Sequence, residues 1–228
     1  MSTVAASVLH PPRAALVELV GPAGAGKTAL LGELRRLAPW IRPGLRPAAR
    51  QHLTSAPALL PIVATLHRPY QGLRWKETKR VLYLLTLARL AAAHRRATSA
   101  PLVLDEGPVY MLARLRVFGG EVVRRGGFAE WWEGAIRRWA DALDHVVWLD
   151  ATDEVLLQRL RTRRQEHPVR WLADDEVIRF LDTYREAYAR VLEDLALTGR
   201  VTVRRFRSDL VSTEEIAGEV LAAIGGPG

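Results

Sequence analysis

The stretch ELVGPAGAGKTAL, residues 18–30, places a run of glycines between an apolar segment and the start of a helical pattern. It fits G-x-x-x-x-G-K-[ST], the pattern of a phosphate-binding loop. Glycines let successive backbone N–H groups turn inward around a phosphate, and the helix that follows adds the positive end of its dipole. The predicted loop consists of Gly21, Pro22, Ala23, Gly24, Ala25, Gly26, Lys27 and Thr28.

The last two residues of this loop carry its chemistry. Lys27 is expected to reach the β- and γ-phosphates of a nucleotide, and the Thr28 hydroxyl is expected to ligate Mg²⁺. The alternative is a glycine-rich turn that binds nothing. Because an apolar run precedes the loop and a helical pattern follows it, we favour the nucleotide-binding interpretation.

The composition is that of an ordinary globular protein. The chain has 228 residues, of which 49% are hydrophobic and 25% charged, so it can bury a core. It contains no cysteine, which excludes disulfides, thiolate metal sites and thiol catalysis. No apolar stretch is long enough to span a membrane, and the N-terminus does not resemble a signal peptide. We therefore expect a cytoplasmic protein.

The net charge of +8 is almost entirely due to arginine, since the chain has only the lysines Lys27, Lys76 and Lys79. The planar guanidinium group of arginine can bind a phosphate with two hydrogen bonds. A general bias toward arginine and alanine would, however, give the same composition. Charge alone suggests nucleic acid, and no recognition motif supports it. We do not expect nucleic acid as a partner, although the charge leaves that alternative open.

Strand patterns alternate with helical patterns along the chain, which predicts an α/β fold with a parallel sheet and helices on both faces. Residues 1–13 are expected to be a flexible lead-in, and residues 14–228 a single domain. Residues 39–61 contain five prolines, so we expect a loop there with at most a short strand. The expected strands are 14–20, 101–108, 145–151 and 200–206, and the expected helices are 26–37, 74–96, 128–143, a helix capped by Thr152, 174–197 and a final helix with a Ser212–Glu215 capping box.

Two acidic residues close the apolar part of the strand predicted over 101–108, since Asp105 ends the run LVLD and Glu106 follows it at once. Asp105 stands where a neighbouring strand of such a sheet supplies the residue that holds the metal. Glu106 could be a general base, a second metal contact or a hydrogen-bond acceptor. Both could also be solvated carboxylates at a strand end. We select Asp105 as a metal and catalytic candidate and Glu106 as a catalytic and substrate-binding candidate.

The segment QRLRTRR, residues 158–164, predicts an arginine-rich lid over about 159–172. Arg159 and Arg163 share a helix face, where their repulsion would be reversed by an anion. Phosphoryl transfer needs such cations, so both are catalytic candidates, and Arg164 is a candidate nucleotide contact. A solvated basic face is the alternative.

The order of these features resembles the thymidylate-kinase-like branch of the P-loop nucleoside and nucleotide kinases, over roughly residues 14–224. The segment 83–96 is similar to the helix that carries a substrate-phosphate arginine in that family, which would be Arg89 here. Arg114 is a further candidate for substrate binding. The chain departs from the family in having Asp105-Glu106 instead of an Asp-Arg pair, and no Arg-Glu-Pro signature lies in 46–65. The resemblance therefore implies the fold and the donor site, but not thymidylate specificity.

These features predict a kinase that uses ATP and Mg²⁺ to phosphorylate a small molecule, most simply a nucleoside or a nucleoside monophosphate. Glu106 is compatible with an acceptor that has no phosphate. The alternatives are an NTP-hydrolysing switch or adaptor and a nucleic-acid end kinase. The histidines lack the spacing of a zinc site, and a homodimer is left open.

Overall fold

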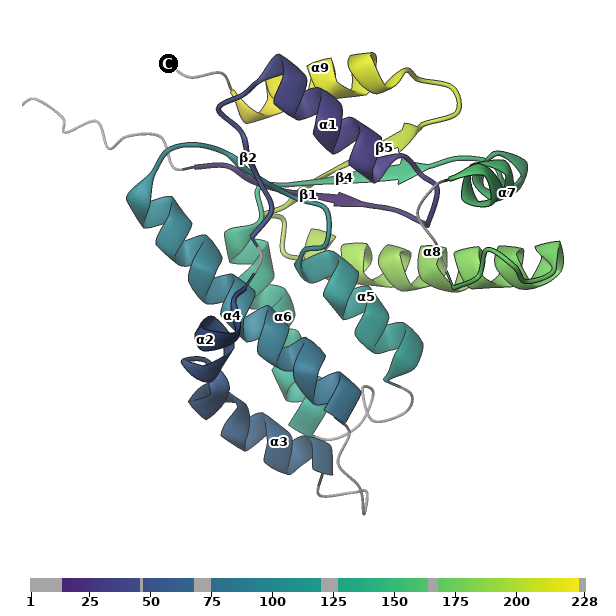
Figure 1. Cartoon of the computed structure of the whole chain (residues 1–228). Coiled ribbons are helices and arrows are strands. Elements are labelled where there is room, and N and C mark those ends of the chain that lie inside the picture. The colour runs from purple at the N-terminus through teal and green to yellow at the C-terminus, as the bar shows by residue number, and fades with distance from the viewer. Residues whose placement is uncertain (1–13, 46, 68–74, 120–126, 164–167, 226–228) are drawn as a thin grey trace, which may run out of the picture.

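A computed structural model describes residues 14–45, 47–67, 75–119, 127–163 and 168–225 (Figure 1). The predicted lead-in over 1–13 and the nucleotide candidate Arg164 lie outside these residues. Among the described segments, no helix combines the length and the apolar character needed to cross a membrane.

The described residues form a five-stranded parallel sheet with the strand order β2-β3-β1-β4-β5. Because β3 lies on one side of β1 and β4 on the other, the direction of winding reverses at β1. In open α/β sheets, ligands bind at the carboxyl ends of the strands at such a reversal. The strands are β1 (Leu16–Val20), β2 (Arg42–Pro43), β3 (Leu102–Leu104), β4 (His145–Asp150) and β5 (Thr202–Arg207).

Helices cover both faces of the sheet, as the sequence predicts (Figure 1). The helices α1 (Lys27–Leu37) and α9 (Thr213–Ile224) lie on one face, and the opposite face is covered by α4 (Trp75–Ala97), α5 (Pro108–Phe118), α6 (Gly127–Ala142) and α8 (Asp174–Ala196). The helix α7 (Asp153–Thr162) follows β4 beyond the carboxyl end of the sheet. This arrangement confirms the predicted fold class.

Each face of the sheet has its own hydrophobic core, and β1 contributes to both. Leu16 and Val20 are buried against α4, α5, α6 and α8, whereas Val17 and Leu19 are buried against α1, α7 and α9. This alternation is the period of two that a strand imposes. Glu18 therefore points to the same side as Leu16 and Val20, where it is completely buried.

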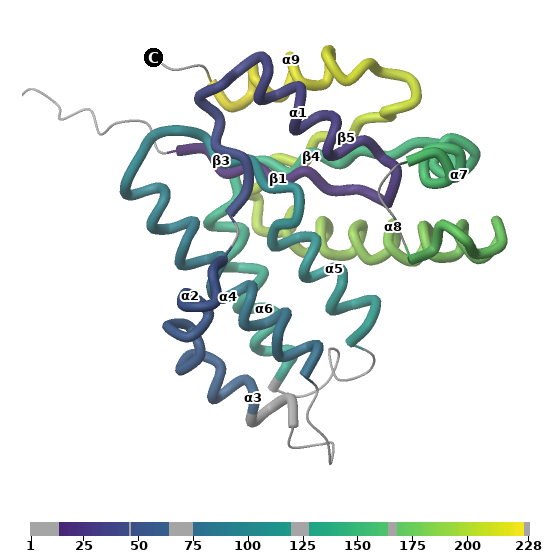
Figure 2. Tube along the Cα trace, viewed as in Figure 1, coloured from purple at the N-terminus to yellow at the C-terminus, as the bar shows by residue number. Residues whose placement is uncertain are grey.

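Most of the predicted elements are present, but β3 (Leu102–Leu104) is shorter than the strand predicted over 101–108, and there are two further differences. The expected loop over 39–61 contains β2, but also α2 (Ala49–Leu53), a 3₁₀ helix η1 (Ala56–Leu59) and the start of α3 (Leu60–His67), so that expectation was wrong in part. Pro57 and Pro61 stand in the first turns of these helices, where a missing N–H costs nothing. The helix α5 was not predicted, because the sequence Gly107-Pro108 was interpreted only as the end of a strand. Of these helices, α2 and η1 contact α4, whereas α3 contacts α6 (Figure 2).

Candidate active site

The predicted phosphate loop connects β1 to α1 and has the backbone of such a loop. Gly21, Gly24 and Gly26 have φ angles of 142°, 88° and 94°, which residues with side chains rarely adopt. A Cβ atom on Gly21 would lie 2.0 Å from the backbone oxygen of Leu149, on the neighbouring strand β4. The shape of the loop therefore requires all three glycines, and packing against β4 also requires Gly21.

Lys27 bends back over the loop. Its Nζ atom donates hydrogen bonds to the backbone oxygens of Gly21 at 2.7 Å and Pro22 at 2.9 Å. Burial lowers the pKa of Lys27 to about 8, and the negative charge of Asp105 opposes this shift. A buried ammonium that is held among loop carbonyls is placed to meet an anion in the loop.

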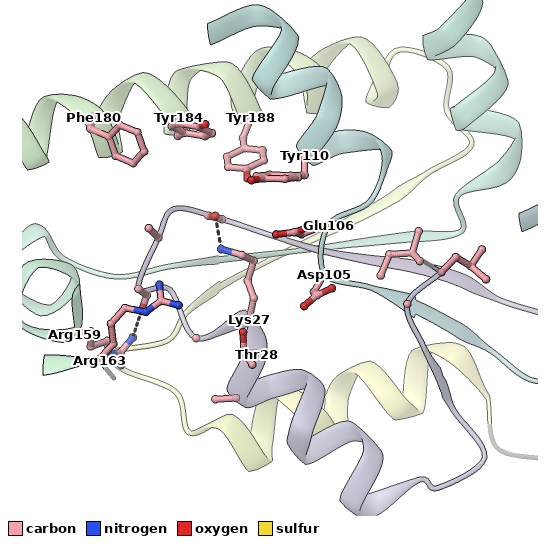
Figure 3. Close-up of a pocket in the computed structure, with 18 of the residues that line it drawn as sticks. Lys27, Thr28, Asp105, Glu106, Tyr110, Arg159, Arg163, Phe180, Tyr184 and Tyr188 are labelled. Carbon is pink, nitrogen blue, oxygen red and sulfur yellow. Dashed lines mark hydrogen bonds between the residues drawn. The ribbon is translucent and has the colours of Figure 1, made fainter. Parts of the chain in front are cut away.

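Asp105 and Glu106 lie beside the loop because β3 pairs with β1 in parallel register, so both strands end at the same edge. The loop, Thr28 and this acidic pair line one cavity of about 670 Å³ (Figure 3). The backbone oxygen of Glu106 accepts a hydrogen bond from the Tyr83 hydroxyl at 3.2 Å, which links the acidic turn to α4. The structure therefore brings the predicted loop and acidic residues together.

Arg159 and Arg163 line the same cavity from α7 and its C-terminal end. Arg159 donates to the backbone oxygen of Gly24 at 3.3 Å and to the side chain and backbone oxygens of Ser208, both at 2.9 Å. Its guanidinium group thus connects α7, the phosphate loop and the segment after β5. Because Arg159 forms these hydrogen bonds, it is not part of a solvated basic face.

The two substrate-binding candidates Arg89 and Arg114 do not line this cavity. Arg89 is exposed on α4 and donates to the Ser55 hydroxyl at 3.0 Å. Arg114 donates to the Tyr110 hydroxyl at 3.3 Å, and its guanidinium group lies 5.7 Å from the centre of the Phe118 ring. Their roles in substrate binding remain predictions.

An aromatic wall stands opposite the phosphate loop and was not predicted (Figure 3). It consists of Phe180, Tyr184 and Tyr188 of α8 and Tyr110 of α5, and all four line the cavity. The ring centres of Phe180 and Tyr184 are 4.9 Å apart, and those of Tyr184 and Tyr188 are 6.1 Å apart. The spacing of four residues along α8 is a signal that could have revealed a continuous aromatic face.

Glu18 is the second feature that sequence reasoning missed. Its carboxylate accepts hydrogen bonds from the backbone N–H groups of Val109 at 2.8 Å and Tyr110 at 2.9 Å, in the first turn of α5. Burial raises its pKa to about 8, although the N–H groups oppose the shift. A carboxylate in the middle of the apolar strand LVELV was the available signal.

No protein-family model matches the chain, and no curated protein matches it. Solved structures do match, and they show that the chain has the fold of the P-loop kinases. The similarity lies in the fold and not in the sequence, since the three structures described below are 12–18% identical to this chain.

The first of these is the YorR protein from Bacillus subtilis in complex with phosphorylated GDP, with a TM-score of 0.51, 16% identity and coverage of 90% of this chain and 92% of that chain. Deoxyadenosine kinase from M. mycoides with bound dATP has a TM-score of 0.55 and 12% identity over 91% and 99% of the two chains. Shikimate kinase from Bacteroides thetaiotaomicron has a TM-score of 0.50 and 18% identity over 90% and 96%. The thymidylate-kinase-like branch remains a prediction.

Proposed function

We propose that the protein is an ATP- and Mg²⁺-dependent phosphotransferase whose acceptor is a small molecule, with a nucleoside or a nucleoside monophosphate as the first choice. One observation carries this proposal. A single cavity is lined by a phosphate loop, by the carboxylates of Asp105 and Glu106 and by the guanidinium groups of Arg159 and Arg163. Phosphoryl transfer needs this combination of an anion cradle, acidic groups and positive charge.

The described residues fit a nucleoside triphosphate with Mg²⁺. The loop cannot carry a side chain at Gly21, and its lysine is held at the loop rather than in solvent. The Thr28 hydroxyl and the Asp105 carboxylate are oxygen groups of the kind that Mg²⁺ prefers, and both line the cavity. When bound, Mg²⁺ would neutralise negative charge on the phosphates.

In this proposal each residue has a separate task. The loop N–H groups and Lys27 hold the phosphate chain, and Glu106 accepts the proton of the acceptor hydroxyl. The acceptor oxygen forms a bond to the γ-phosphorus, the bond from that phosphorus to the bridging oxygen breaks, and ADP leaves. Arg163 stabilises the charge that develops on the transferred group. Most of the rate gain would come from positioning and from charge stabilisation.

The aromatic wall favours an acceptor that contains a ring. Phe180, Tyr184 and Tyr110 face the phosphate loop across the cavity (Figure 3), so a base or sugar ring could lie against them while its hydroxyl reaches Glu106. Because a deoxyadenosine kinase shares the fold, nucleosides are the first acceptors to test, with thymidylate among the monophosphates. Because a shikimate kinase shares it as well, acceptors that are not nucleotides belong in the same panel.

The test is a turnover assay with ATP, Mg²⁺ and a panel of nucleosides, nucleoside monophosphates, sugars, hydroxy acids and short oligonucleotides. We expect ADP formation that depends on an acceptor and that is lost in Lys27→Met. ADP formation at the same rate without any acceptor would instead indicate an NTP-hydrolysing protein. Transfer to oligonucleotides alone would indicate a nucleic-acid end kinase.

A further inference from the structure

The guanidinium group of Arg185, on α8, binds the turn that connects β4 to α7. Its Nε and Nη2 atoms donate to the Asp150 carboxylate at 3.1 and 3.2 Å, and Nη2 also donates to the backbone oxygen of Ala151 at 3.0 Å. Its Nη1 atom donates to Asp153, the first residue of α7, at 2.6 Å and to Asp182 of α8 at 2.8 Å. All five N–H donors of the guanidinium group are therefore used, and four of them bind the turn.

Arg185 and its partners are partly shielded from solvent, unlike an ordinary surface ion pair. The side chains of Arg185, Asp150 and Asp153 are only 20%, 27% and 34% exposed. Burial works against the charge of Arg185, but its hydrogen bonds to Asp153, Asp150 and Asp182 prevail and raise its pKa. Charge-assisted hydrogen bonds from a planar fork fix geometry as well as adding energy. Arg185 is therefore suited to fix the direction in which α7 leaves the sheet.

The helix α7 that begins at this turn lies against the phosphate loop. A Cβ atom on Gly24 would be 3.1 Å from the backbone oxygen of Leu156, in the first turn of α7. Arg159 reaches the same loop further along the helix, at the backbone oxygen of Gly24. Arg163 caps the C-terminal end of α7, ten residues and thus about 15 Å after Asp153. A change in the direction of α7 at its first residue would therefore displace Arg163 most.

The helix α8 contacts the candidate site in two places. Phe180, Tyr184 and Tyr188 form the aromatic wall, and Arg185, directly after Tyr184, binds the turn before α7. Figure 1 shows α7 beside α8, and the two helices are in contact. One helix therefore sets the position of the wall and of the arginines of α7 relative to each other.

We infer that Arg185 is a positioning residue, which holds α7 at the angle that brings the Arg163 guanidinium group to the transferred phosphoryl group. The inference rests on the proposed function, in which Arg163 stabilises the charge that develops during transfer. A displacement of about 1 Å at a catalytic group can cost about a hundred-fold in rate, even when the changed residue is remote. Arg159 has hydrogen bonds of its own to Gly24 and Ser208, so the affinity for ATP should depend less on Arg185.

The first experiment measures turnover and ATP affinity, with the best acceptor found in the panel. We expect Arg185→Gln to lower turnover about ten- to a hundred-fold and to change the dissociation constant of ATP by less than about three-fold. Arg185→Lys should recover part of the turnover, since lysine keeps the charge but not the fork. Asp153→Asn should have a smaller effect of the same kind. The control is Arg179→Gln, which removes the arginine of an exposed pair with Asp175 on the same helix and should behave like the parent.

A double-mutant cycle with Arg163→Ala separates positioning from a general structural role. If Arg185 acts through Arg163, Arg185→Gln should lower turnover by less than about two-fold in the Arg163→Ala background. A loss by the same factor in both backgrounds would overturn the inference while the kinase function still stood, and so would parent-like turnover of Arg185→Gln. Circular dichroism checks that each variant is folded. If Arg185→Gln does not fold, Asp153→Asn takes its place in the cycle.

The second experiment observes the end of α7 directly and needs no turnover. Because the chain contains no cysteine, Thr162→Cys, at the exposed end of α7, takes a single spin label. Arg185→Gln and Asp153→Asn should increase the mobility of the label in its electron paramagnetic resonance spectrum, whereas Arg179→Gln should not. Unchanged mobility would overturn the inference. If no nucleotide binds and no acceptor is phosphorylated, the proposed function fails, and this measurement still decides whether Arg185 holds α7.

Discussion

The backbone N–H of Tyr110 donates to the Glu18 carboxylate at 2.9 Å, although the two residues are 92 positions apart in the sequence. Val109 donates to the same carboxylate at 2.8 Å. Glu18 belongs to the strand that leads into the phosphate loop, and Tyr110 belongs to the helix that follows Asp105 and Glu106. One buried side chain therefore holds the two halves of the candidate site in a fixed relation.

The first prediction concerns the loss of this contact. Glu18→Ala leaves two buried N–H groups without a partner, and each such group costs about 1–3 kcal/mol. We expect the free energy of unfolding, measured in urea, to fall by about 2–5 kcal/mol. The control is Glu33→Ala, which removes an acidic side chain whose partner Arg36 is exposed, and it should change stability little. Equal effects of the two substitutions would contradict the assigned role of Glu18.

The second prediction concerns pH. Burial raises the pKa of Glu18 from 4.5 to about 8, so the folded state binds this proton more tightly than the unfolded state. The resulting stabilisation is complete below pH 4.5 and is lost as the pH rises through about 8. Glu18→Gln cannot titrate, so its unfolding free energy should decline less between pH 5 and pH 8 than that of the parent. Urea unfolding across this range checks the two slopes, and parallel profiles would show that Glu18 is ionised throughout.

The third prediction concerns Gly107, which has no room for a side chain. A Cβ atom there would lie 2.6 Å from the carboxyl carbon of Glu18, so Gly107→Ala must displace the carboxylate from the start of α5. We expect a loss of stability of about 1–3 kcal/mol, as overpacking of a core produces. Gly32→Ala in α1 is the matched control, because nothing lies within 4 Å of its added Cβ atom. It should be neutral or slightly stabilising, since alanine favours a helix. The measurement is the melting temperature of each variant compared with that of the parent.

Local patterns predicted the parts of the site that depend on local chain geometry. The phosphate loop follows from glycine spacing next to Lys27, and the position of Asp105 follows from its place at a strand end. Parallel strands share a carboxyl edge, so the strand assignment placed these residues at one edge of the sheet, and the pairing of β1 with β3 brings them together. The helix α5 was missed because Pro108 was interpreted as a stop, whereas proline in the first turn also starts a helix.

The remaining parts depend on packing between distant segments, which no local pattern records. Glu18 contacts α5 only because β1 and β3 are neighbours, and the order of the strands cannot be inferred from the sequence of either strand. The bonds from Arg159 to Gly24 and Ser208 likewise join three separate segments. Arg89 was selected from a resemblance, and the structure places it outside the cavity because its part of α4 faces η1 instead.

The fourth prediction separates Arg159 from Arg163. Arg163→Ala should lower turnover about a thousand-fold or more with little change in ATP affinity, as the loss of an arginine that acts only in the transition state does. Arg159→Ala should weaken ATP binding as well, because it removes the bond to the loop oxygen of Gly24. Arg161→Ala is the control, since Arg161 bonds Leu172 and Asp174 and does not line the cavity. Turnover and ATP affinity are measured for each variant. Equal small effects in all three would remove the catalytic role from this segment.

The last prediction concerns Asp105, which directly follows β3 and lines the cavity with Thr28. If its carboxylate holds Mg²⁺ through a water molecule, a neutral amide in its place should hold that water poorly. Asp105→Asn should therefore keep the fold, raise the Mg²⁺ concentration needed for half-maximal turnover and lower affinity for the metal by about ten- to a hundred-fold.

The measurement is ATP turnover as a function of Mg²⁺ concentration, with the melting temperature as the check on folding. Asp175→Asn serves as the control, because Asp175 pairs with Arg179 on the exposed side of α8, away from the cavity. It should leave the Mg²⁺ dependence unchanged. A parent-like Mg²⁺ dependence in Asp105→Asn would transfer the metal role to Glu106, the other carboxylate after β3 that lines the cavity. In that case Glu106→Gln should show the shift in Mg²⁺ dependence, whereas a general base at Glu106 predicts a loss of turnover that added Mg²⁺ does not restore.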